Sequence, residues 1–272
     1  MKKLVALCLV LVLSLSLVCA SAAEKLTIIA TPSPHGELLD LISDDMAKLG
    51  YDLDITIVTD YVVENPATSA GDVMVNYFQH IPYLDSYNET VGENDRLVGV
   101  IPTHFEPLAI YSGTKTDLTT LEKGDKVIVP NDPSNRTRAL LLLQDANLIK
   151  LADDVDINSQ VNIEDVKENS LGLEIMEANA ELIAGLRSDA AICVINGNNA
   201  ALAELNPMKD GLFFEGTESL AAKSYPNLFA VRTENENADF VKALETCVYS
   251  QEVYDLMVDR GFVPLFEVPA AK

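Results

Sequence analysis

Residues 25–57, KLTIIATPSPHGELLDLISDDMAKLGYDLDITI, decide the fold class of this chain. The apolar run 25–30 predicts a buried strand, and the Pro- and Gly-rich segment 31–36 predicts a turn. Apolar residues at helical spacing from Leu38 to Leu49 predict a helix that ends at Gly50. Strict alternation over 52–57 then predicts a second strand with one face in solvent. This order of strand, helix and strand is typical of an α/β fold with a mainly parallel sheet.

The same rhythm continues along the chain and restarts near Tyr111. Neither a low-complexity linker nor a repeat separates the two halves, which favours two lobes joined by crossing strands over two independent domains. The pattern predicts strands over 71–76, 97–101, 126–129, 190–195 and 228–231, and helices over 135–146, 180–186 and, in two stretches, 238–259.

Composition excludes several classes of protein. The 272 residues include 42 acidic and 19 basic ones, and the formal net charge is -23. Nucleic acid is excluded as a partner, because its phosphates require basic patches. The length suits about two units with their own cores. Cys193 and Cys247 lie in apolar segments and are expected to be buried thiols. The sequence therefore predicts an acidic globular protein that handles a small molecule.

The first 22 residues are predicted to be a signal peptide. Basic residues precede an apolar run over 4–18, which is shorter than the roughly 20 residues that span a membrane. Ala20-Ser21-Ala22 fits a cleavage site, while Cys19 is a candidate for lipidation as the first residue of a bacterial lipoprotein. Val18 fits the position before such a cysteine poorly. We expect an exported protein on the outer face of the bacterial membrane or in the periplasm, anchored by a lipid at Cys19.

Signatures of catalysis are missing from the sequence. It contains no G-x-S-x-G, no P-loop, no H-E-x-x-H and no G-x-G-x-x-G after a strand. The three histidines each follow a predicted strand and could converge on zinc, but none is paired at ligand spacing. We therefore expect no metal, no cofactor and no enzyme. The alternative that stays open is a metal-dependent hydrolase or lyase that uses His80, His104 and Glu106.

Candidate binding residues lie at the ends of predicted elements. Arg138 follows Ser134, the expected N-cap of a helix, where backbone N–H groups and a guanidinium together suit an anion. Asn196 comes directly after a strand, where α/β sheets bind ligands. Asn227 precedes another strand. Ordinary roles in ion pairs, caps or turns remain alternatives for all three.

A small aromatic group is the candidate wall of a pocket. Its members are Tyr61, Phe78 and His80. Since aromatic residues make up only 6% of the chain, their grouping is notable, although core packing would explain it equally well.

Several motifs in order carry a family resemblance. They are Thr31–Glu37 (TPSPHGE), Asn76–Leu84 (NYFQHIPYL), His104–Ser112 (HFEPLAIYS), Val129–Asn135 (VPNDPSN), Arg138–Leu143 (RALLLL), Val194–Asn196 (VIN) and Tyr225–Asn227 (YPN). Together these stretches resemble the NlpA/MetQ family, the methionine-binding lipoproteins of bacterial ABC importers. The resemblance spans essentially the whole chain after its leader.

The resemblance implies a two-lobed periplasmic-binding-protein fold, type 2-like, with the ligand in a cleft between the lobes. Lobe 1 would comprise 24–109 plus 228–272, and lobe 2 would comprise 110–227. The protein would capture L-methionine or a close relative and deliver it to an ABC permease and its ATPase. A surface adhesin with the same fold stays open as a third reading.

The resemblance also implies roles for single residues. Arg138 would hold the methionine carboxylate, and Asn196 and Asn227 would bond its amino and carboxylate groups. The side chain would be enclosed by Tyr61, Phe78 and His80. His104 and Glu106 match a motif at the lobe crossover and are expected to be structural or hinge residues rather than ligand contacts. Asn199 stands where related sequences usually carry an aromatic residue, so a methionine-containing dipeptide remains an alternative ligand.

Overall fold

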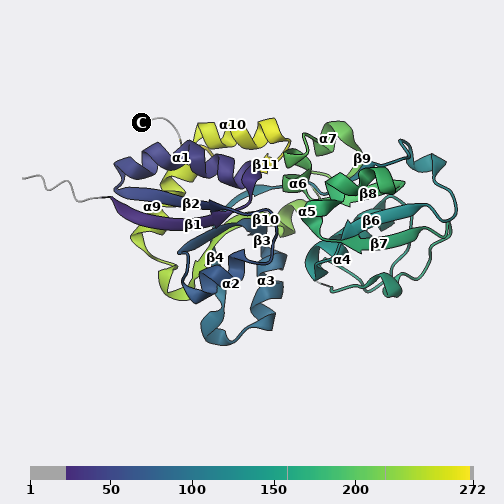
Figure 1. The fold of residues 1–272 in the computed structure, drawn as a ribbon, viewed down its shortest axis with the longest axis horizontal. Coiled ribbons are helices and arrows are strands. Elements are labelled where there is room, and N and C mark those ends of the chain that lie inside the picture. Colours follow the sequence, from purple (N-terminus) through teal and green to yellow (C-terminus); the bar gives the residue numbers. More distant parts are fainter. Residues whose placement is uncertain (1–22, 158, 218, 270–272) are drawn as a thin grey trace, which may run out of the picture.

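The computed structural model describes residues 23–157, 159–217 and 219–269. The predicted signal peptide and Cys19 lie outside these residues. Two sheets form the cores of two lobes that lie side by side (Figure 1). Within the described part of the chain, no helix has both the length and the apolar character that crossing a membrane requires.

The first sheet has six strands in the order β11-β4-β10-β3-β1-β2. β1 is parallel to both of its neighbours, whereas β10 is antiparallel to β3 and β4. The sheet is therefore mixed, not mainly parallel as the sequence pattern suggested. The strands are β1 (Glu24–Ala30), β2 (Tyr51–Ile57), β3 (Val75–His80), β4 (Leu97–Phe105), β10 (Pro226–Arg232) and β11 (Val263–Pro264).

Helices cover both faces of this sheet (Figure 1). Apolar side chains of α1, α9 and α10 pack on the sheet in one large core cluster, which supplies most of the hydrophobic free energy of this lobe. The helices of this lobe are α1 (Glu37–Lys48), α2 (Glu64–Ala70), α3 (Ile81–Thr90), α9 (Asp239–Val248) and α10 (Gln251–Arg260).

The second sheet has five strands in the order β7-β6-β8-β5-β9. Two core clusters lie on it, one of them against the helix α4. Its elements are β5 (Ala109–Ser112), β6 (Lys126–Pro130), α4 (Pro133–Asp145), β7 (Glu174–Ala178), α5 (Ala180–Ile183), β8 (Ile192–Ile195), α6 (Gly197–Leu202), α7 (Pro207–Asp210), β9 (Gly211–Phe214) and α8 (Leu220–Ser224). Short 3-10 turns, η2 (Glu93–Asp95) among them, and the turn η1 (Pro32–Gly36) complete the fold.

The chain passes between the sheets twice, from β4 to β5 and from β9 to β10. β5 begins at Ala109 and β10 at Pro226. The exact limits of the two lobes along the chain remain a prediction. The short β4–β5 connection consists of Glu106, Pro107 and Leu108, so it places Glu106 directly between the lobes.

Two predicted elements begin at other residues than expected. The strand expected over 71–76 starts at Val75, because Gly71 adopts a φ of 81° and ends α2. The helix expected from Asn135 starts at Pro133, and its N-cap is Asp132, whose carboxylate accepts the Asn135 N–H. Ser134 is therefore not the cap. The two body cysteines are free and buried, as expected.

Candidate functional site

A small cavity lies between the two sheets. Its lining includes all six residues singled out from the sequence as ligand-binding, and it also includes residues that sequence reasoning missed or assigned another role. The lining residues are Tyr61, Phe78, Gln79, His80, Tyr83, Glu106, Asn135, Arg138, Asn196, Asn198 and Asn227. Both lobes and the β4–β5 connection contribute to it.

Arg138 projects from the first turns of α4 and is only 3% exposed. Its guanidinium forms a double hydrogen bond with Glu215, Nε to Oε1 at 2.8 Å and Nη2 to Oε2 at 2.5 Å. Nη2 also donates to the backbone oxygen of Glu106 at 2.7 Å. Among the described residues Nη1 has no hydrogen-bond acceptor, so this nitrogen can still donate to a further group.

Glu215 is the main residue that sequence reasoning missed. Its carboxylate also accepts the Leu108 N–H at 2.8 Å, which fixes it against the β4–β5 connection. Burial alone would lower the pKa of Arg138, but the adjacent Glu215 carboxylate raises it. The ion pair thus keeps a buried guanidinium charged and holds its orientation.

The N-terminus of α4 does not provide an open anion site. The Asp132 carboxylate accepts the backbone N–H of Asn135 at 2.9 Å, and it also accepts from the Asn135 and Ser134 side chains. The expectation that helix N–H groups beside Arg138 bind the anion is therefore unsupported, because the protein's own carboxylate occupies that end of the helix.

A chain of amides orients Asn196. Asn135 Nδ2 is held by Asp132, so its Oδ1 faces the cavity side and accepts from Asn196 Nδ2 at 2.8 Å. Asn196 Oδ1 is buried and has no hydrogen-bond donor among the described residues. A buried acceptor without a partner costs free energy, so the lining of the cavity requires a donor at this point.

His80 is held in one tautomer. Its Nδ1 accepts the Tyr83 N–H at 3.2 Å, and its Nε2 lies 2.9 Å from Asn135 Oδ1, which requires the proton on Nε2. Burial, with the positive charge of Arg138 in second place, lowers the pKa of His80 to about 3. His80 is thus a neutral donor that ties the first lobe to Asn135 in the second.

Because His80 is buried in its neutral form, the folded protein becomes less stable at acidic pH. In the unfolded chain its pKa returns to about 6.5, so this stabilisation is complete above about pH 6.5 and is lost as the pH falls toward 3. Between pH 7 and pH 5, we expect the free energy of unfolding to fall by about 2 kcal/mol more in the wild type than in His80→Gln, whose side chain keeps an N–H donor. Urea unfolding at both pH values measures the difference, and equal losses would contradict it.

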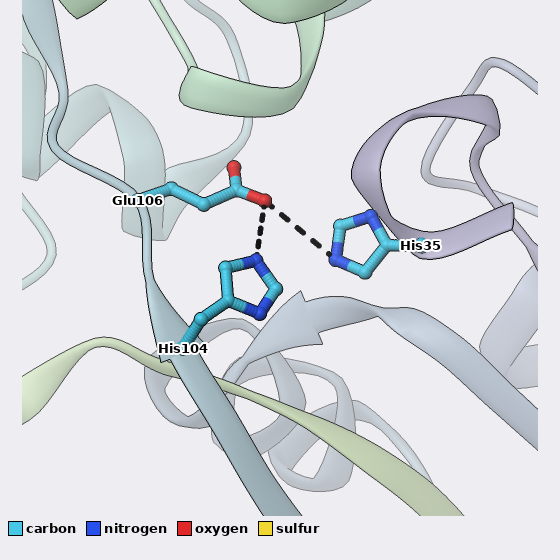
Figure 2. A group of neighbouring side chains, drawn as sticks. All are labelled: His35, His104 and Glu106. Atoms are coloured by element: carbon cyan, nitrogen blue, oxygen red, sulfur yellow. Dashed lines mark hydrogen bonds and ion pairs between the residues drawn. The ribbon is translucent and has the colours of Figure 1, made fainter. Parts of the chain in front are cut away.

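The three histidines do not converge. His35 and His104 meet at Glu106, whereas His80 binds Asn135 and the Tyr83 backbone (Figure 2). His104 Nε2 is 2.9 Å and His35 Nε2 is 3.7 Å from Glu106 Oε1. The grouping of His80, His104 and Glu106 expected for a metal-dependent enzyme is therefore not present.

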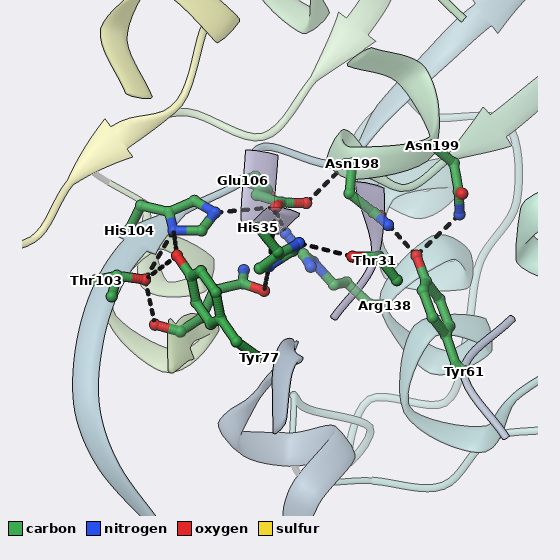
Figure 3. A network of polar contacts seen from close by, with 11 residues as sticks. Thr31, His35, Tyr61, Tyr77, Thr103, His104, Glu106, Arg138, Asn198 and Asn199 are labelled. Atoms are coloured by element: carbon green, nitrogen blue, oxygen red, sulfur yellow. Dashed lines mark hydrogen bonds and ion pairs between the residues drawn. The ribbon is translucent and has the colours of Figure 1, made fainter. Parts of the chain in front are cut away.

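The donor set of His35, His104 and Glu106 could hold a metal ion by its spacing alone. However, each of its polar atoms already has a protein partner. His35 Nδ1 pairs with the Thr31 hydroxyl at 2.7 Å, and His104 Nδ1 lies 2.8 Å from the Thr103 hydroxyl. Glu106 Oε2 accepts the Asn198 N–H at 2.7 Å (Figure 3). This cluster is complete as a hydrogen-bonded network and does not require an ion.

Glu106 supplies a negative charge to this cluster. Burial would raise the pKa of Glu106, but the hydrogen bond from His104 and the nearby His35 outweigh burial and lower it. Burial lowers the pKa of His35 to about 4, so that imidazole is neutral. Glu106 thus brings a carboxylate to the cavity wall, and its backbone and side chain both contact the second lobe.

Close approach of α6 to Glu106 depends on Gly197. A Cβ at this position would lie 2.6 Å from the Cβ of Glu106. Any other residue would push the N-terminus of α6 away from the β4–β5 connection.

Asn227, the second residue of β10, accepts from His35 Nε2 through its Oδ1 at 3.3 Å and is 4% exposed.

Aromatic rings form the remaining wall. The ring centroid of Phe78 lies 6.0 Å from that of Tyr61 and 5.6 Å from that of Tyr83. Asn199, in contrast, is not part of the lining. Its Nδ2 donates to the Tyr61 hydroxyl at 2.8 Å, so it acts on the cavity only through that ring.

A family model described as NlpA lipoprotein matches residues 26–266. The chain belongs to the NlpA lipoprotein family. The D-methionine-binding lipoprotein MetQ of Escherichia coli is 42% identical to this NlpA-family protein over 218 residues, which are 79% of this chain and 78% of that protein.

Solved structures agree with this membership. A nutrient binding protein from Burkholderia cenocepacia, bound to methionine, is 33% identical with a TM-score of 0.82, and the match covers 89% of this NlpA-family chain and all of that one. A lipoprotein from Ruminococcus gnavus is 38% identical with a TM-score of 0.85 over 90% of this chain and all of the other. The two-lobed binding-protein fold implied by the sequence motifs is thereby confirmed.

Proposed function

We propose that this chain is an extracytoplasmic binding protein that captures L-methionine and delivers it to an ABC permease and its ATPase. The observation that carries this proposal is the pairing of two unsatisfied groups in one cavity. Among the residues that the structure describes, Asn196 Oδ1 lacks a donor and Arg138 Nη1 lacks an acceptor, and both side chains line the cavity. An amino acid supplies both, an ammonium for the first and a carboxylate for the second.

The aromatic wall supports a thioether side chain. Methionine sulfur interacts favourably with aromatic rings, and three rings line the cavity with centroids 5.6–6.0 Å apart, those of Phe78, Tyr61 and Tyr83. Because Asn199 is directed to Tyr61 and not to the cavity, its small size gives no added space for a dipeptide. A single amino acid is therefore the ligand that we favour.

The composition of the cavity lining supports binding without chemical conversion. Among the described residues that line it there is no Ser, Thr or Cys, and both ring nitrogens of His80 are engaged by the protein. We therefore propose that the protein binds and releases its ligand unchanged. In line with its family, we also propose export and a lipid anchor at Cys19.

Calorimetric titration tests the proposal. The mature protein is partially unfolded and dialysed to remove carried-over ligand, then titrated with L-methionine, D-methionine, glycyl-methionine and zinc chloride. We expect one-to-one binding of L-methionine, with unchanged ligand recovered by mass spectrometry. Binding of zinc without any methionine compound, or conversion of the ligand, would overturn the proposal.

Replacing Phe78 with alanine tests the side-chain wall. Phe78 is 4% exposed and contacts two further rings, so its removal should weaken L-methionine binding by about 1–3 kcal/mol. L-alanine, which lacks the thioether, should lose much less affinity. Titration of both ligands measures this, and equal losses would remove Phe78 from the wall.

A further inference from the structure

The hydroxyl of Tyr61 joins the two lobes at the edge of the cavity. It donates to Asn198 Oδ1 at 2.5 Å and accepts from Asn199 Nδ2 at 2.8 Å (Figure 3). Tyr61 lies between β2 and α2 in the first lobe, and the two asparagines lie in α6 of the second. Both hydrogen-bonding roles of this hydroxyl are thus filled from across the cleft.

Each partner in this contact is also held by a neighbouring group, Tyr61 by Tyr83 within the first lobe and Asn198 by the β4–β5 connection. The Tyr83 hydroxyl donates to the backbone oxygen of Tyr61 at 2.7 Å, and the Phe78 ring packs beside the Tyr61 ring. Asn198 N–H is anchored on Glu106. Asn198 and Asn199 are 4% and 5% exposed. The contact therefore joins two preorganised surfaces, which reduces the entropy lost when it forms.

These hydrogen bonds connect lobes that must separate before an enclosed ligand can leave. We expect hinge opening to move α6 away from the segment that carries Tyr61, which would break both bonds on opening and restore them on closure. Tyr61 also lines the cavity, whereas Asn199 does not. Asn199 can therefore affect the dwell time of a ligand without contacting it.

We propose that Tyr61, Asn198 and Asn199 form a closure latch, in which Asn199 is a positioning residue that slows ligand release by holding the Tyr61 hydroxyl. This inference rests on the proposed function for its ligand, methionine. The latch acts on the opening rate, because its bonds are present in the closed form and must break before the lobes separate. The relative affinities for different ligands depend on the cavity wall and not on the latch.

Stopped-flow kinetics with L-methionine tests the latch in Tyr61→Phe, Asn199→Ala and the double variant. We expect Tyr61→Phe to raise the dissociation rate constant about threefold to tenfold, the scale of one or two hydrogen bonds, with the association rate constant within about twofold of wild type. Asn199→Ala should raise dissociation about threefold. In the Tyr61→Phe background the same change should add nothing, because its acceptor is already gone.

Two matched controls separate the latch from general damage. Tyr111→Phe removes a buried hydroxyl that has no hydrogen-bond partner among the described residues, and Asn169→Ala removes an amide that bonds only Leu173 within the second lobe. Both should leave dissociation unchanged. Unchanged dissociation in Tyr61→Phe and Asn199→Ala, or full additivity in the double variant, would overturn the latch, as would an altered ratio of methionine to alanine affinity in Asn199→Ala.

The radius of gyration of the ligand-free protein, measured by small-angle X-ray scattering, tests the latch without any ligand. If wild-type protein fails to bind methionine, the proposed function fails, yet the latch still predicts a larger radius of gyration for Tyr61→Phe than for wild type or Tyr111→Phe. Equal radii in all three proteins would then overturn the latch itself.

Discussion

Replacing Arg138 with methionine is expected to weaken methionine binding about tenfold to 150-fold and to destabilise the fold as well. Among the described residues that line the cavity, Arg138 is the only one with a cationic side chain, and loss of its hydrogen bonds to a ligand carboxylate costs about 1.5–3 kcal/mol of binding free energy. The same change leaves the Glu215 carboxylate buried without its partner. Breaking a buried ion pair on one side costs about 3–5 kcal/mol of folding stability.

A second variant separates the two losses. In the double variant Arg138→Met with Glu215→Gln, no charge is left unpaired, and the glutamine oxygen can still accept the Leu108 N–H. We expect most of the stability to return while methionine binding stays as weak as in the single variant. Urea unfolding and calorimetry measure these two quantities. Methionine affinity near that of wild type in the double variant would exclude Arg138 as the carboxylate partner.

Replacing Glu64 with glutamine is expected to stabilise the protein at neutral and alkaline pH. Glu64 opens α2, is 0% exposed, and neither of its carboxylate oxygens has a hydrogen-bond partner among the described residues. Burial raises the pKa of this carboxyl to about 8, with the charges of Asp60 and Glu181 adding to the effect. The folded protein therefore holds this group protonated at neutral pH.

The sign of the effect follows from proton binding. Between about pH 4.5 and pH 8 the folded state keeps a proton that the unfolded state loses, so the free energy of unfolding falls as the pH rises. A glutamine side chain does not titrate, so it does not contribute to this fall in the free energy of unfolding. Its advantage over the wild type should grow by up to about 1.4 kcal/mol per pH unit and reach about 3 kcal/mol near pH 7, relative to pH 4.5.

Urea unfolding of both proteins at several pH values between 4.5 and 8 measures this slope. Any fixed cost of burying the amide shifts the difference equally at every pH, so the slope alone is diagnostic. Glu93→Gln, at an exposed carboxylate of η2, is the matched control and should give a flat difference. A flat difference for Glu64→Gln as well would show that this carboxyl is ionised in the folded protein.

Local patterns were sufficient for much of the fold. Helical spacing, strand alternation and the stop at Gly50 placed the opening β-α-β unit, because periodicity and backbone preference act within a few residues. The position of Asn196 directly after a buried strand likewise made it a candidate, since strand ends converge on ligands in α/β sheets. The motifs shared with the NlpA family then implied the two lobes.

Long-range pairing was decided only by the tertiary structure. Glu215 is one of 42 acidic residues, and nothing in its neighbourhood along the chain marks it as the partner of a residue 77 positions away. The same holds for Asn135, which orients both His80 and Asn196, and for the direction of Asn199 toward Tyr61.

The sequence by itself thus determined which elements form and which side chains stand at their ends. Only the packing of the two lobes decided that Arg138 is paired with Glu215 and that Asn196 Oδ1 has no donor among the described residues. The same packing placed His35 and His104 beside Glu106 and left His80 outside this group. The physical reason is that hydrogen-bond partners are selected by position in space, and positions in space depend on contacts between residues far apart in the chain.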